Sequence, residues 1–256
     1  MIVKGAGKSH IGKVREQNQD TIFVNNRGLG VLPNLYVVAD GLGGHQSGEV
    51  ASRKATEAFC DYFSIMADEH SSYESPSSSV QEFFLAALRY ANERVFQNAA
   101  NVFENRGMGT TFSAATIENS IINFVHVGDS RIYLVKENNT LEQITNDHVS
   151  VTTELLKQGL ITQEEAKKYP ETVLSRAIGT DSEVKIDIGA ASLNGVKYVI
   201  LCSDGLHNML IDDEITKILE NESDLEFLAE KLVVAANMAG GRDNISVIVI
   251  RWGETL

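Results

Sequence analysis

The chain has 256 residues, of which 43% are hydrophobic and 22% are charged, a composition that argues against a disordered or collagen-like chain. Lys and Arg together number 22 against 35 Asp and Glu, and the resulting net charge of −13 disfavours general binding to nucleic acid or to an anionic lipid surface. The two cysteines, Cys60 and Cys202, lie far apart and in no CxxC arrangement, so neither a disulfide framework nor a thiolate zinc site is expected.

Neither a targeting segment nor a membrane span is predicted. Residues 1–5 do not begin a signal peptide, and no apolar run approaches the roughly 18 residues of a transmembrane helix. We therefore expect a cytoplasmic protein without membrane association. The length allows one or two domains of about 150 residues each. We expect a single domain over residues 1–256, because no linker separates two complete cores.

Two long helices are predicted first in chain order. Apolar residues recur at three- and four-residue spacing over about 47–68 and again over about 79–104. The serine-rich stretch 71–79 between them has the composition of a surface connection. Gly107 is expected to end the second helix.

Short strands follow, because the sequence period then changes. The predicted strands, joined by turns rich in Asn, are 110–117, 121–127, 131–136 and 140–144. The polar segment 149–169 is predicted to be helical, as two short helices divided at Gly159.

The next elements are again strands. An alternating segment at 184–193 and a buried strand at 197–202 flank Asn194 and Gly195, a pair that favours a β-hairpin turn. We therefore predict that these two strands form a hairpin.

Two helices and a strand complete the predicted elements. The helices cover about 212–220 and 223–238, and the second begins with a capping box of Ser223 and Glu226. The strand covers about 244–252. Strands in an antiparallel run, with helices in pairs at two places, indicate an α+β fold class.

Five aspartates lie at the ends of predicted strands. They are Asp40, Asp129 and Asp204, which follow strands, and Asp20 and Asp243, which precede them. One such residue alone is usually a turn residue whose carboxylate accepts bonds from local amides. Five would meet at one rim if their strands lie side by side, and there they would raise one another's pKa unless cations lie among them.

The chemistry of such a rim favours hard divalent ions. Ligands that are all oxygen select Mg²⁺ or Mn²⁺, and two such ions nearly offset five carboxylates. A pair of these ions about 3.5–4 Å apart can activate a bridging water and stabilise a phosphoryl oxygen.

Around these aspartates the sequence resembles the PP2C-type (PPM family) metal-dependent protein serine/threonine phosphatases, of the compact bacterial kind. The stretches that carry the resemblance occur in the family's order and span nearly the whole chain: 12–20 (GKVREQNQD), 38–45 (VADGLGGH), 47–52 (SGEVAS), 109–111 (GTT), 127–131 (VGDSR), 203–206 (SDGL) and 241–246 (GRDNIS). Each stretch alone is a weak signal, and together they are specific.

The resemblance implies a fold and a set of site roles. The fold is a four-layer αββα sandwich of two antiparallel sheets flanked by helix pairs, with a flap over about 149–177 beside the site. The implied ligands of two Mn²⁺ or Mg²⁺ ions are Asp20, Asp40, Asp204, Asp243 and the backbone carbonyl of Gly41. Arg15 would bind the substrate phosphate, and Asp129 would help to bind a weaker third ion. Arg15, Asp40 and Asp204 are thus the implied catalytic residues.

Three residues depart from the pattern of animal members. Gln19 replaces a Glu that contacts water near the metals, and Leu42 replaces the His proposed there as general acid. Asn208 replaces an Asp of the third site and should weaken metal binding there. The general acid stays open between His45 and a metal-bound water.

Other histidines and arginines carry no motif. His126 lies in an apolar strand and is expected to be a core residue with satisfied hydrogen bonds, whereas His10, His70 and His148 are expected at the surface. Arg131 is expected to be structural.

We therefore expect an enzyme that hydrolyses phosphoserine and phosphothreonine on proteins by a metal-activated water. Its expected partners are phosphorylated proteins, including a serine/threonine kinase and its substrates, and the default oligomeric state is a monomer. Two alternatives are a non-catalytic interaction module on the same fold and a phosphatase of small phosphoesters. The first is disfavoured because all four core aspartates are present.

Overall fold

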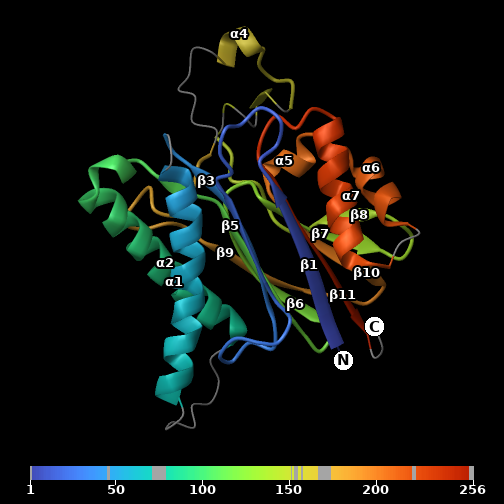
Figure 1. The fold of residues 1–256 in the computed structure, drawn as a ribbon, viewed down its shortest axis with the longest axis horizontal. Coiled ribbons are helices and arrows are strands. Elements are labelled where there is room, and N and C mark those ends of the chain that lie inside the picture. Colours follow the sequence, from blue (N-terminus) through green and yellow to red (C-terminus); the bar gives the residue numbers. More distant parts are fainter. Residues whose placement is uncertain are drawn as a thin grey trace.

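The computed structural model describes residues 2–44, 47–70, 79–150, 152, 155–156, 158–166, 174–220 and 223–253. Its strands form two sheets in which every pairing is antiparallel, and helices lie on the outer sides of both (Figure 1). No helix in this part of the chain combines the length and apolar character needed to cross a membrane.

The first sheet has the order β2-β3-β5-β6-β9, with the short strand β4 paired to β3. Its strands are β2 (Asp20–Asn25), β3 (Leu35–Leu42), β4 (Gly109–Thr110), β5 (Phe112–Glu118), β6 (Ile121–Val127) and β9 (Asp187–Ser192). The second sheet has the order β1-β11-β10-β7-β8. Its strands are β1 (Ile2–His10), β7 (Arg131–Lys136), β8 (Leu141–Gln143), β10 (Val196–Cys202) and β11 (Ile245–Gly253).

The helices divide between the two sheets. The first sheet is covered by α1 (Ser47–His70) and α2 (Val80–Asn101), which the short 3₁₀ turn η1 (Phe103–Asn105) follows. The second is covered by α5 (Asp204–His207), α6 (Asp212–Leu219) and α7 (Leu225–Met238). The remaining helix, α4 (Gln163–Ala166), projects away from both helix groups at the top of Figure 1.

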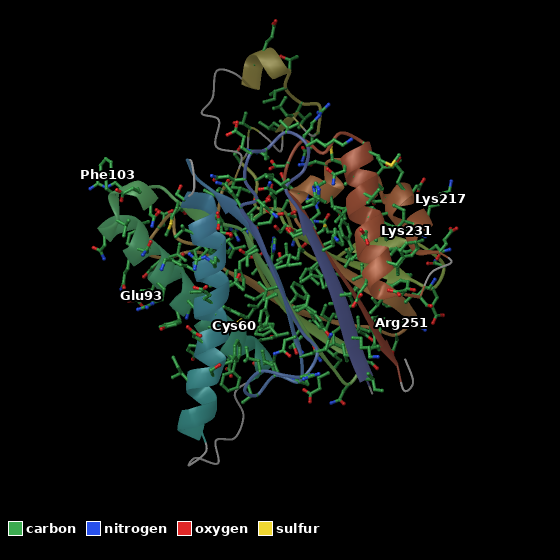
Figure 2. All side chains as sticks on the ribbon, viewed as in Figure 1. Cys60, Glu93, Phe103, Lys217, Lys231 and Arg251 are labelled. Atoms are coloured by element: carbon green, nitrogen blue, oxygen red, sulfur yellow. The ribbon has the colours of Figure 1, made fainter. Side chains whose placement is uncertain are left out.

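Apolar runs explain this layering, because successive residues of a strand point to opposite faces. In β3, Val37 packs toward α1 and α2, while its neighbour Val38 packs between the sheets. In β11, Val247 packs toward α7, while Ile248 packs between the sheets. Each sheet is therefore buried on both faces, and Figure 2 shows side chains filling the space between them.

The predicted α+β class with two antiparallel sheets is confirmed. The second helix ends at Asn101, earlier than predicted, and a 3₁₀ turn follows. The predicted strand 110–117 is divided into β4 and β5. Within the described part of 149–169, residues 152, 155 and 156 are helical before Gly159 and α4 follows it, which agrees with two short helices divided at that glycine.

The predicted hairpin around Asn194 and Gly195 is wrong. The chain does turn there, with Gly195 at a φ of 70°, but β9 pairs with β6 while β10 pairs with β7 and β11. The turn thus carries the chain from one sheet to the other. Turn chemistry fixes the reversal of direction, whereas the partner of each strand is fixed by the faces that it buries.

The predicted capping box of the last helix is also wrong. The N-cap of α7 is Asp224, whose carboxylate accepts a hydrogen bond from the backbone N–H of Phe227. Asp is as good an N-cap as Ser, so the pattern shifts by one residue.

Candidate active site

The strand ends bring the predicted aspartates to one rim. Asp20 begins β2 and is the direct partner of Asp40 in β3. Asp204 follows β10 and begins α5, and Asp243 stands just before β11. These two adjoin strands of the second sheet, so the rim joins both sheets. Asp40, Asp129, Asp204 and Asp243 line one pocket of about 630 Å³ together with Arg15.

Burial and mutual repulsion perturb these carboxyls strongly. Burial raises the pKa of Asp20 to about 6, and the charge of Asp243 adds to this rise. Burial also raises the pKa of Asp204 to about 6, with repulsion from Asp243 and Asp20 adding to it. The pKa of Asp40 lies well above its ordinary value, because it is buried among Asp20, Asp204 and Asp129. Such a cluster is costly unless a cation accompanies it.

The hydrogen bonds leave specific oxygens for that cation. The hydroxyl of Ser203 donates to Oδ2 of Asp20 at 2.8 Å, and Nδ2 of Asn208 donates to Oδ2 of Asp204 at 3.0 Å. The other oxygens, Oδ1 of Asp20 and Oδ1 of Asp204, are buried and have no hydrogen-bond partner among the described residues. Buried acceptors are normally satisfied, so this pair indicates a place for an ion.

These oxygens fit a hard divalent cation, which takes carboxylate and carbonyl ligands. Among the residues that the structure describes, no three Asp, Glu, His or Cys groups already stand at the spacing of a formed metal centre. Because uncompensated carboxylates repel one another, small side-chain rotations would have to complete the ligand set.

Arg15 supplies positive charge at the rim. Its Nη2 donates to Oδ2 of Asp243 at 2.6 Å, and this bond raises the pKa of the guanidinium. The side chain of Arg15 is 53% exposed, and among the described residues its guanidinium bonds Asp243 alone. The remaining donors can bind a phosphate, for which a planar guanidinium is well suited.

The loop of Arg15 is held by Asn244, a residue that the sequence analysis did not single out. The Nδ2 group of Asn244 donates to the backbone carbonyls of Ile11 and Gln17, both at 2.9 Å. Its Oδ1 accepts from the backbone N–H of Gln19 at 2.8 Å. One buried amide therefore fixes both ends of the segment that carries Arg15 and leads into Asp20. The only sequence signal was its place beside Asp243.

The glycine at position 41 is required by close packing. A side chain on Gly41 would collide with the backbone carbonyl oxygens of Gly48 and Gln19. The lack of a side chain at Gly41 lets the first turn of α1 approach the end of β3 that carries Asp40.

Asp129 and Asn208 differ in how they meet the site. Asp129 lines the pocket and its charge helps to raise the pKa of Asp40, while its backbone carbonyl contacts Nε2 of His207 at 3.0 Å. Nδ2 of Asn208 donates a hydrogen bond to the carboxylate of Asp204, which is one of the expected ligands of the two core ions. Asn208 therefore contacts the expected core site as well as being the residue expected at a third site.

Two histidine predictions have clear outcomes. His126 is buried and contacts Ser113 and the carbonyl of Asn146, which confirms a core histidine. His148 is 5% exposed and contacts Gly128 and Asp187, so its expected place at the surface is wrong. Polar neighbours in sequence concealed its burial. His45, the candidate general acid, lies outside the described residues.

Arg131 is structural, as expected. Its guanidinium makes two hydrogen bonds with Asp147, at 2.9 and 2.7 Å.

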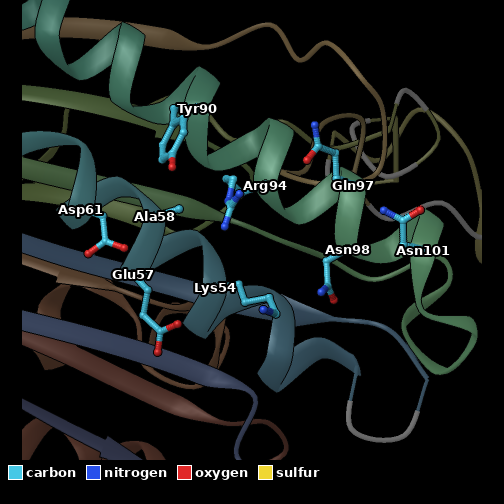
Figure 3. A pocket seen from close by; sticks show the side chains of 9 residues that line it. All are labelled: Lys54, Glu57, Ala58, Asp61, Tyr90, Arg94, Gln97, Asn98 and Asn101. Atoms are coloured by element: carbon cyan, nitrogen blue, oxygen red, sulfur yellow. The ribbon is translucent and has the colours of Figure 1, made fainter. Parts of the chain in front are cut away.

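A smaller pocket lies between the outer faces of α1 and α2, with Tyr90 and Arg94 among its lining residues (Figure 3). It contains none of the predicted site residues.

Comparison with known proteins agrees with this geometry. The family model described as protein phosphatase 2C matches residues 6–236. The protein phosphatase PhpP of Streptococcus pneumoniae is 36% identical over 249 residues, which cover 95% of each chain.

Solved structures give the same answer. The serine/threonine phosphatase Stp1 of Staphylococcus aureus is 29% identical, with a TM-score of 0.82 over 99% of this chain and 96% of that one. The catalytic domain of the phosphatase PstP, solved with two manganese ions, is 29% identical, with a TM-score of 0.75 over 98% of each chain.

Proposed function

This chain belongs to the protein phosphatase 2C family and is a metal-dependent serine/threonine protein phosphatase, and we propose which of its residues form the site. Asp20, Asp40, Asp204 and Asp243, with the backbone carbonyl of Gly41, hold two Mn²⁺ or Mg²⁺ ions. The observation that carries this proposal is the pair of buried oxygens on Asp20 and Asp204 that accept no hydrogen bond within the part of the chain that the structure describes. When bound, the ions supply Lewis-acid activation of a water and of the phosphoryl group.

The chain's own residues bind and orient the substrate. Arg15 binds oxygens of the phosphate with the donors that Asp243 leaves unused, and stabilises the charge that develops on them. Ser203 and Asn208 each hold one oxygen of a carboxylate, which aims the second oxygen at the ion. Asn244 holds the Arg15 segment against β11.

Finer features of the fold belong to the same proposal. The three core clusters, one beneath each helix group and one between the sheets, support a four-layer αββα sandwich in a single domain. Support for a flap over 149–177 comes from its base, where Val149 pairs with Leu174 and the N–H of Ser175 donates to the carbonyl of His148.

The remaining roles follow the family resemblance. Asp129 is proposed to help bind a weaker third ion. The proposed substrates are phosphoproteins, including a serine/threonine kinase and its targets, in the reducing cytoplasm where Cys60 and Cys202 stay free.

A metal-dependence assay tests the proposed site. Chelated protein should not hydrolyse a phosphothreonine peptide, and Mn²⁺ should restore turnover. Asp204→Asn should lose at least about a hundredfold in kcat, because it removes a charged ligand. Asp212→Asn, an exposed aspartate in the first turn of α6, is the matched control and should behave as wild type. Normal turnover and metal content in Asp204→Asn would make Asp204 a turn residue only.

A further inference from the structure

One wall of the pocket is formed by the segment 174–181, which hydrogen bonds attach to the fold. In this wall, Ile178 exchanges two backbone hydrogen bonds with Thr110, at 2.8 and 3.0 Å, and the hydroxyl of Thr110 donates to the carbonyl of Asp40. The buried Asn92 of α2 accepts a bond from the N–H of Gly179 at 2.8 Å and donates to the carbonyl of Asp181 at 3.1 Å. Side chains on this wall therefore hold a fixed position relative to Asp40.

Arg176 stands on this wall and is anchored on one side only. Its Nη1 donates to Oδ1 of Asp187 at 2.9 Å and lies 3.1 Å from Nε2 of His148. Within the described residues its Nε and Nη2 groups make no hydrogen bond, and the side chain lines the pocket. The side chain is 26% exposed, half the exposure of Arg15.

The anchor behind Arg176 is itself fixed. Nδ1 of His148 accepts from the backbone N–H of Gly128, so its proton is on Nε2, which donates to Oδ2 of Asp187 at 3.0 Å. Burial lowers the pKa of His148, which keeps the ring neutral. Asp187 thus carries one negative charge, and Arg176 is the cation that it positions.

The charges of the pocket leave this arginine available to the substrate. Arg15 and Arg176 are the only cationic side chains among the described residues that line the pocket. Arg15 lies with the aspartates and is assigned to the phosphate. Arg176 comes from a different segment of the pocket lining, which also includes Asp181.

We propose that Arg176 forms a second anion-binding subsite, which takes the carboxylate of an acidic residue close to the phosphorylated residue of the substrate. This inference rests on the proposed function, and it names a preference for acidic substrate segments. Asp187 holds one edge of the guanidinium, and the substrate carboxylate binds the other. Asp181 opposes this preference through like charge.

The test is a selectivity ratio measured with phosphothreonine peptides. A peptide with Gln at the positions flanking the phosphorylated residue is compared with peptides that carry Glu at one of those positions in turn. For wild type, kcat/KM for the best Glu peptide should exceed that for the Gln peptide by about three- to tenfold at low salt, the range of an exposed to half-buried ion pair. The ratio should shrink in high salt.

Variants locate the source of the preference. Arg176→Gln should bring the ratio close to one, Arg176→Lys should keep part of it, and Asp181→Asn should increase it. Lys136→Gln removes the same charge from β7, where Lys136 pairs with Glu142, and should keep the wild-type ratio. Thermal unfolding of each variant verifies that it is folded.

The outcomes separate two failures. A wild type that turns over every peptide with a ratio near one, or an Arg176→Gln variant that keeps the wild-type ratio, overturns the subsite and leaves the phosphatase intact. A wild type that turns over no phosphopeptide with Mn²⁺ present overturns the proposed function itself.

Discussion

At the scale of single residues, the site is a set of carboxylates whose oxygens have divided roles. Ser203 holds one oxygen of Asp20, and Asn208 holds one oxygen of Asp204. The second oxygen of each carboxylate is buried and has no partner among the residues that the structure describes. Arg15 is tied to the cluster through Asp243. Each of these contacts predicts a different consequence of substitution.

Arg15→Ala should affect substrate binding more than turnover. The guanidinium binds the phosphate in the ground state as well as in the transition state, so KM for a phosphopeptide should rise about tenfold or more, with a smaller fall in kcat. Steady-state kinetics at saturating Mn²⁺ measure both constants. An unchanged KM would remove Arg15 from the phosphate site.

Asn208→Asp should change how the protein depends on metal. The substitution replaces a donor to Asp204 by a carboxylate, which repels Asp204 when no ion is bound and offers a further ligand when one is. We expect a lower melting temperature in chelator, and half-maximal activity at a lower Mn²⁺ concentration than in wild type. If neither the melting temperature in chelator nor the Mn²⁺ concentration for half-maximal activity differs from wild type, this prediction is wrong.

At the scale of elements, the start of β11 holds the segment that carries Arg15 in place. Asn244 precedes the strand, and its amide bonds both ends of the 11–17 segment, so a loop far away in sequence takes its shape from the second sheet. Asn34 makes a similar buried clamp elsewhere, with bonds to the N–H and carbonyl of Ile117.

Asn244→Ala should loosen this loop and with it Arg15. We expect a loss of about 1–3 kcal/mol in unfolding free energy, because three backbone groups lose a partner, and a rise in KM that exceeds the fall in kcat. Asn34→Ala is the matched control, with a similar loss of stability and an unchanged KM. In the Arg15→Ala background, Asn244→Ala should raise KM little further. Equal KM effects from Asn34→Ala and Asn244→Ala would show that general destabilisation is the cause.

At the scale of the whole molecule, the acidic rim couples stability to pH and to metal. The pKa of Asp20 and of Asp204 is about 6 in the folded protein, above the value of about 3.9 for an unfolded aspartate. Between these values the folded state binds more protons than the unfolded state. The contribution of these groups to stability is therefore lost as pH rises from about 4 to 6.

Metal should reverse that loss. Chelated protein should melt at a lower temperature at pH 7 than at pH 5, and Mn²⁺ should raise the melting temperature by several degrees more at pH 7, since about 1 kcal/mol corresponds to 2–4 °C at this size. Asp204→Asn should show a smaller dependence on pH in chelator. Calorimetry in matched buffers measures each difference. An equal effect of Mn²⁺ at both pH values would contradict this coupling.

The sequence by itself determined the composition of the layers and the presence of an acidic rim. The apolar run 197–202 predicted a buried strand, because burial on both faces leaves no polar alternation. Aspartates at strand ends predicted an acidic rim. Both signals are local, so they survive without knowledge of the partner strands.

Only the tertiary structure decided which distant groups meet. It placed β9 and β10 in different sheets although a hairpin turn joins them, because strand partners depend on the faces that each strand buries. It buried His148 in contact with Asp187 and Arg176. It also placed the amide of Asn244 within hydrogen-bond distance of a loop more than two hundred residues away in sequence. Contacts of this kind depend on packing between elements, which no local pattern encodes.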